Sequence, residues 1–83
     1  MSEFGIVIAD ILKERVRQDK KWGANRVLPD FTWNAILTEE VGEAAKEVLE
    51  VDVKKLRVEL IQVAAVAVAW IESLDRRKGA PDA

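Results

Sequence analysis

The chain contains neither cysteine nor histidine among its 83 residues. The first absence excludes disulfides, zinc–thiolate sites and thiol nucleophiles. The second removes the commonest general base and the commonest ligand of transition metals. Serine occurs only as Ser2 and Ser73, and without a histidine to activate either hydroxyl a serine hydrolase is excluded. Chemistry is therefore left to carboxylates, lysines and arginines, and to any metal ion that the carboxylates hold.

Long apolar runs and an excess of positive charge are missing as well. The longest apolar stretch, 63–71, is too short to cross a bilayer. The first residues lack the basic segment of a signal peptide, so we expect a cytoplasmic protein with no membrane partner. Lysine and arginine together number 13 against 15 aspartates and glutamates. This balance gives no support for nucleic-acid binding.

Helix-stop and helix-cap residues divide the sequence into segments with apolar residues at helical spacing. Gly23 and Pro29 mark a loop after the first segment. Asp30 or Thr32 can cap the next helix, and Asp52 can cap the one after it, because each offers an oxygen to free amides of a first turn. We predict an all-α fold with one domain, 1–83, and helices over about residues 4–20, 32–51 and 53–78.

The third predicted helix is apolar nearly all round. From Leu60 to Ile71 the only polar residue is Gln62, and a helix advances about 100° per residue. A chain of 83 residues has too few other helices to cover such a surface. A helix buried inside a monomeric bundle would give the same pattern. We expect self-association into a helical bundle, such as a four-helix bundle, as a homodimer or a dimer of dimers.

The second predicted helix carries glutamates along the edge of its apolar stripe. Residues 31–51 contain five glutamates and a single basic residue, Lys46. Glu40 falls within about 20° of Trp33 on that stripe, and Glu43 borders it. Carboxylates on a core-facing stripe are unfavourable unless they are paired or bind a cation. A shared cation is the simplest explanation of this crowding.

The third predicted helix supplies matching oxygen atoms. Glu59 and Gln62 lie within about 60° of each other on one face. Two antiparallel helices would place them opposite Glu40 and Glu43, which forms an all-oxygen site. Such a site suits Mg²⁺ or Mn²⁺ and does not suit zinc. Ion pairs from the glutamates to basic residues such as Arg57 would explain the same spacing without a metal.

The order of these residues resembles that of a known family. The segment 39–43 (EEVGE), followed after a helix break by 59–62 (ELIQ), resembles the EExxE…ExxD pattern of the MazG-like, all-α nucleotide pyrophosphohydrolases. The upstream segment 17–23 (RQDKKWG) is similar to the small MazG-like proteins of phages and mobile elements, and the resemblance spans about residues 10–76. It implies a MazG-like protomer and a Mg²⁺-dependent enzyme. Such enzymes cleave nucleoside triphosphates to a monophosphate and pyrophosphate, which cleanses nucleotide pools.

Carried over to this chain, the family's Mg²⁺ ligands are Glu40, Glu43 and Glu59, and its fourth ligand, an aspartate, falls on Gln62. Glutamine offers only a neutral carbonyl oxygen, so this departure predicts weaker metal binding. It favours a second function, that of a catalytically weak or inactive helical oligomer that binds nucleotides or a protein partner. In the family mechanism metal-bound water attacks a phosphorus atom. Glu39 or Glu43 would position this water or take its proton.

Side chains around the first loop are candidates for holding the nucleotide. Trp22 and Trp33 could stack on a base, although tryptophans at helical spacing are more often core residues. Lys21 and Arg17 could bind the triphosphate oxygens. A solvated helix end would explain these two cations equally well.

Overall fold

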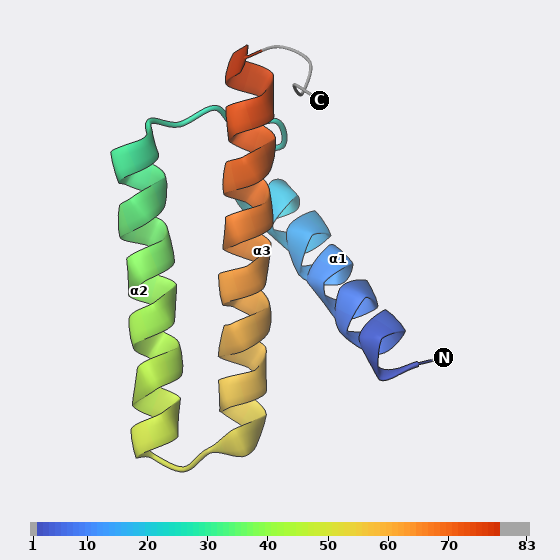
Figure 1. Cartoon of the computed structure of the whole chain (residues 1–83), viewed down its shortest axis with the longest axis vertical. Coiled ribbons are helices and arrows are strands. Elements are labelled where there is room, and N and C mark those ends of the chain that lie inside the picture. The colour runs from blue at the N-terminus through green and yellow to red at the C-terminus, as the bar shows by residue number, and fades with distance from the viewer. Residues whose placement is uncertain (1, 79–83) are drawn as a thin grey trace.

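Three helices make up the fold, which the computed structural model describes over residues 2–78. They are α1 (Glu3–Trp22), α2 (Asp30–Leu49) and α3 (Val53–Lys78). Figure 1 shows α2 and α3 side by side and antiparallel, whereas α1 packs on α3 and diverges from it toward the N-terminus. The predicted all-α fold is confirmed, and each helix end lies within two residues of its predicted position.

The ends of α2 are where the sequence prediction was least accurate. Pro29 precedes the helix and no side chain caps it, so neither Asp30 nor Thr32 serves as the predicted cap. The carboxylate of Asp30 instead accepts a hydrogen bond from Trp70 Nε1 at 3.1 Å, which fastens the start of α2 to α3. At the other end Val51 has a φ of 56°. A left-handed conformation does not continue an α-helix, and α2 therefore ends before it.

The other breaks follow the sequence signals closely. The N–H of Lys55 donates to Asp52 Oδ1 at 3.0 Å, which confirms Asp52 as the cap of α3. Gly23 has a φ of 98°, a value that glycine adopts without a Cβ penalty. Its N–H donates to the carbonyl of Asp19 at 2.9 Å and ends α1.

The buried core lies between α2 and α3. It consists of Trp33, Val66 and Ala69, and the Trp33 side chain is 1 % exposed. Ala65 is fully buried as well, and such small residues let the two helices approach closely. The apolar side chains packed around this core are Leu28, Ile36, Leu37 and Trp70. Val66 thus belongs to the core of the protomer itself.

Large parts of the apolar surface remain uncovered within the protomer. On α1, Phe4 is 74 % exposed and Leu12 is 64 % exposed. On α3, Leu60 and Ile71 are 52 % and 57 % exposed, and they lie within about 20° of each other on one face. The predicted self-association stays a prediction, and these residues are where it would act. Within residues 2–78, no helix has the length and hydropathy needed to cross a membrane.

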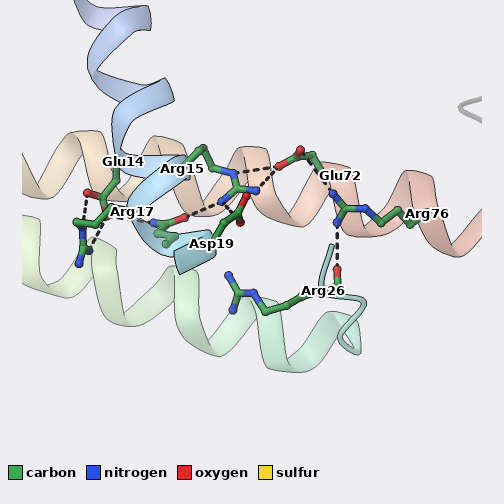
Figure 2. Close-up of polar contacts among 8 residues, drawn as sticks. Glu14, Arg15, Arg17, Asp19, Arg26, Glu72 and Arg76 are labelled. Atoms are coloured by element: carbon green, nitrogen blue, oxygen red, sulfur yellow. Dashed lines mark hydrogen bonds and ion pairs between the residues drawn. The ribbon is translucent and has the colours of Figure 1, made fainter. Parts of the chain in front are cut away.

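Polar contacts attach α1 to α3. Arg15 is buried and donates from Nε to the Glu72 carboxylate at 3.0 Å (Figure 2). Nearer the N-terminus, Arg57 of α3 donates to Asp10 at 2.8 Å. In the described part of the chain no Cα atom of α1 lies within 8 Å of a Cα atom of α2. Side chains of α1 and α2 therefore face each other across a space instead of packing tightly.

Candidate functional site

Glu40, Glu59 and Gln62 meet between α2 and α3. Glu40 belongs to α2, and the other two lie on consecutive turns of α3. In the orientation of the Gln62 amide that satisfies both of its polar atoms, its nitrogen donates to Glu59 Oε2 at 2.9 Å and to Glu40 Oε2 at 3.0 Å. The structure thus brings together three of the four side chains that the sequence analysis assigned to a metal.

The two carboxyl groups of this cluster both have raised pKa values, although a hydrogen bond with Glu40 lowers that of Glu59 in part. Burial raises the pKa of Glu40 above its ordinary value of 4.5, and the charges of Glu59 and Glu43 raise it further. Burial likewise raises the pKa of Glu59, and the charges of Glu43 and Glu47 add to the effect. Like charges favour the neutral form of a carboxyl group. A cation bound here would reverse this effect and lower both pKa values.

The remaining predicted ligands stand around this pair without closing a cage. Glu39 and Glu43 are both exposed at the surface of α2. Glu43 acts on the cluster through its charge, which raises the pKa of Glu40 and of Glu59. Within the residues that the structure describes, no three acidic side chains converge closely enough to form a group that could hold a metal ion.

Glu47 is a neighbour of the cluster that the predicted ligand set left out. Its side chain is only 9 % exposed, and its Oε2 atom has no hydrogen-bond partner among the described residues. A buried carboxylate oxygen without a donor is unfavourable. The place of Glu47 beside the cluster could be predicted from its spacing, since Glu47 follows Glu43 by four residues and so lies on the same side of α2.

A pocket of about 500 Å³ lies beside the cluster, between α1 and α2. Glu39 and Glu40 form its acidic side, and the neutral Gln62 lies beside them. Its basic and aromatic side comes from α1 and the loop that follows α1. The residues lining the pocket are Glu14, Arg17, Gln18, Lys21, Trp22, Arg26, Trp33, Ile36, Glu39, Glu40, Gln62 and Val66.

Two of the predicted nucleotide-binding residues lie at the mouth of this pocket. Trp22 is 60 % exposed, so its ring is accessible to a planar ligand. The ammonium of Lys21 lies 4.9 Å from the centre of that ring, a cation–π distance. A stacked ring and a phosphate group could therefore contact neighbouring side chains here.

Arg17 lines the pocket with its charge already compensated. Its Nε and Nη2 atoms donate to the two oxygens of Glu14 at 2.8 and 2.7 Å (Figure 2). This bidentate pair links residues one turn apart on α1. A phosphate group would have to compete with Glu14 for this guanidinium.

Trp33 is a core residue that also borders the pocket. Its exposed fraction is 1 %, and the Arg26 guanidinium lies 5.1 Å from the centre of its ring. A base could stack on this ring only by displacing Arg26. The Trp33 Nε1 atom is buried and has no hydrogen-bond partner among residues 2–78.

Comparison of the chain with family models, with curated proteins and with solved structures finds no match. The residues themselves show a small all-α protein with three helices. The MazG-like resemblance remains an interpretation that rests on the motifs at 39–43 and 59–62.

Proposed function

We propose that this protein is a Mg²⁺-dependent nucleoside triphosphate pyrophosphohydrolase that releases a monophosphate and pyrophosphate and so cleanses nucleotide pools. The observation that carries the proposal is the meeting of Glu40, Glu59 and Gln62 beside a pocket with a basic and aromatic opposite side. Carboxylate oxygens suit a hard cation, whereas arginine, lysine and tryptophan side chains suit phosphates and a base. The MazG-like order of the acidic motifs supports the same conclusion.

In the proposed reaction the acidic cluster holds the metal ion. Glu40 and Glu59 would supply charged oxygens, and Gln62 would supply its carbonyl oxygen after its amide turns over. The exposed Glu43 side chain would have to turn toward them to become a third charged ligand. Bound Mg²⁺ or Mn²⁺ would polarise phosphate oxygens and lower the pKa of a water molecule. Glu39, which lines the pocket, or Glu43 would orient that water or accept its proton.

A non-catalytic oligomer that binds nucleotides or a protein partner is the second candidate. The specific observation in its favour is the Gln62 amide, which bridges Glu40 and Glu59 with two hydrogen bonds. A neutral bridge compensates the two carboxylates partly without any metal. The pocket could then retain a nucleotide that it does not cleave.

Both candidate functions include self-association of the chain. The exposed apolar residues on α1 and α3, among them Phe4, Leu12, Leu60 and Ile71, support assembly into a homodimer or a dimer of dimers. Burying apolar surface at about 25 cal/mol per Å² favours such contacts. The acidic cluster lies between α2 and α3 of one protomer, so assembly would cover apolar faces without being needed to bring Glu40 to Gln62.

The test is pyrophosphate release from a panel of nucleoside triphosphates with Mg²⁺ or Mn²⁺. We expect release that a chelator stops and that Glu40→Gln or Glu59→Gln abolishes. Glu50→Gln, an exposed change beyond the end of α2, is the matched control and should keep full activity. Nucleotide binding without release in any member of the panel would favour the non-catalytic candidate. If the protein neither binds nor cleaves any nucleotide of the panel, both candidate functions are wrong.

A further inference from the structure

Arg26 lies in the loop between α1 and α2 and extends into the pocket. Its guanidinium sits 5.1 Å from the centre of the Trp33 ring, and the residue lines the pocket. Figure 2 shows the side chain reaching from the loop toward the C-terminal part of α1, away from Arg76. The ring of a core residue thus supports a charged group at the pocket surface.

The backbone at Arg26 and just after it is fixed to α3 by two hydrogen bonds. The carbonyl of Arg26 accepts a hydrogen bond from Arg76 Nη1 at 3.3 Å. Two residues later, the N–H of Leu28 donates to the Ser73 hydroxyl at 3.3 Å, and Ser73 is itself buried at 2 % exposure. These contacts hold the loop in place, so the Arg26 side chain is positioned before any ligand arrives.

The charge of Arg26 is not compensated within the described part of the chain. No carboxylate there forms a hydrogen bond or ion pair with its guanidinium. Asp19 is the acidic group that acts on it, but this carboxylate already accepts a hydrogen bond from Arg15 at 3.0 Å. Burial lowers the pKa of Arg26, and the nearby charge of Arg15 lowers it further.

The other arginines near this pocket differ from Arg26 in this respect. Arg15 is bonded to Asp19 and Glu72, and Arg17 is bonded to Glu14. A half-buried cation with no carboxylate partner is unfavourable unless something of opposite charge binds it. A hydrogen-bond acceptor without charge, such as the edge of a base, would leave that cost mostly in place.

We propose that Arg26, held over Trp33, is the residue that binds a phosphate group of the ligand in this pocket. A guanidinium matches phosphate geometry with two parallel hydrogen bonds. Lys21 lines the same pocket and adds a second positive charge. The assignment deepens the proposed function and rests on it for the identity of the ligand as a phosphate ester, but it does not require that the ligand be cleaved.

The test uses inorganic triphosphate as the probe, measured by calorimetry in metal-free buffer at fixed ionic strength. Arg26→Gln should weaken binding about tenfold or more, because a charge-assisted hydrogen bond is lost. Arg26→Met keeps an unbranched side chain over Trp33 and should lose as much affinity for triphosphate. This variant makes the same test if Arg26→Gln does not fold. The matched control is Arg57→Gln, whose arginine pairs with Asp10 outside this pocket. It should change the affinity by less than about twofold.

Two results of the binding measurement would overturn the assignment. One is that inorganic triphosphate binds the parent and the Arg26 variants with equal affinity, or does not bind the parent at all. The other concerns guanosine, which has no phosphate. If the Arg26 variants lose as much affinity for guanosine as for triphosphate, Arg26 binds the edge of a base. Arg26-dependent binding without pyrophosphate release would instead remove the proposed enzyme and leave the phosphate site. Pyrophosphate release that persists unchanged in Arg26→Gln would support the proposed enzyme and show that Arg26 is not its phosphate-binding residue.

Discussion

Gln62 of α3 donates a hydrogen bond to Glu40 of α2 at 3.0 Å and thereby links the two helices at the centre of the acidic cluster. The same amide nitrogen also donates to Glu59 at 2.9 Å. A neutral side chain therefore stands where the MazG-like pattern places an aspartate. The behaviour of this position separates a metal site from a purely structural cluster.

Replacing Gln62 by Asp should make the protein more dependent on Mg²⁺. In metal-free buffer the change removes the amide donor and adds a third carboxylate, so the free energy of unfolding should fall by about 1–3 kcal/mol. Added Mg²⁺ should raise the melting temperature of this variant more than that of the parent, because a cation that binds only the folded state stabilises it by mass action. Thermal melts with and without Mg²⁺ measure both effects.

Gln62→Asn is the control for this prediction, since asparagine has the shape of aspartate without its charge. It should melt at a temperature that hardly depends on Mg²⁺. Equal Mg²⁺ responses in the parent and in Gln62→Asp would show that Gln62 lies outside any metal site.

Replacing Glu40 by Gln should stabilise the metal-free protein near neutral pH. The pKa of Glu40 is raised above 4.5 in the folded chain, so the folded state binds more protons than the unfolded state between 4.5 and the raised value. Stability then falls as the pH rises through this range, and the penalty is fully present above it. Glu40→Gln lacks the charge that carries the penalty, while its amide oxygen still accepts from Gln62.

Urea unfolding at a series of pH values with a chelator present measures this difference. The advantage of Glu40→Gln should appear above the raised pKa and vanish below about 4.5, where both states of the parent are protonated. Glu50→Gln, at an exposed position, should show no such pH-dependent advantage. A Glu40→Gln protein less stable than the parent at neutral pH would mean that the Glu40 charge supports the fold.

The sequence predicted the parts of this protein that local signals determine. The cap at Asp52 and the glycine at Gly23 are recognisable without tertiary contacts, and the helices begin and end within two residues of the predicted positions. The meeting of Glu40 with Gln62 was also predictable. A short connection forces α2 and α3 to run antiparallel, and helical spacing then fixes which side chains face each other.

Other features depend on packing that no local pattern encodes. Arg26 sits in a loop without periodicity, so its place over Trp33 follows only from the way α3 anchors that loop. The third predicted helix is apolar nearly all round, so periodicity alone does not distinguish its buried face, with Val66, from its exposed face, with Ile71. By contrast, the Arg17–Glu14 pair joins residues three apart on one helix and was within reach of a spacing argument.

Ile71→Asp should dissociate the expected oligomer and leave the protomer folded. Ile71 is 57 % exposed in the protomer, so the new charge meets water unless another subunit covers it. Val66→Asp should instead unfold the protein, because Val66 is 5 % exposed in the protomer core and a buried unpaired charge is costly. Light scattering at micromolar concentration should give at least twice 9.3 kDa for the parent and the monomer mass for Ile71→Asp.

Asn34→Asp adds the same charge on an exposed position of α2 and should leave the mass unchanged. A parent protein with the monomer mass at these concentrations would contradict the expected assembly. An Ile71→Asp variant with the parent's mass would move the interface away from this face of α3.

Replacing Arg15 by Met should detach α1 while α2 and α3 remain packed. The Arg15 side chain is 10 % exposed and joins Glu72 of α3 to Asp19 of α1, whereas none of the described residues of the Trp33 core belongs to α1. Both partners of Arg15 are more than a third exposed, so water would solvate them after the change. We therefore expect a loss of about 1–3 kcal/mol, less than for a fully buried pair.

Hydrogen exchange measured by mass spectrometry locates this loss. Amides of α1 should exchange faster in Arg15→Met, while those of α2 and α3 keep their protection, because α1 opens as a separate unit. Arg57→Gln is the control, since it breaks another contact between α1 and α3 whose arginine is 51 % exposed, and an exposed pair contributes at most about 1 kcal/mol. An equal loss of protection in all three helices would show that α1 is an integral part of the cooperative core. Faster exchange confined to α1 would show that the basic side of the pocket depends on the contact between Arg15 and Glu72.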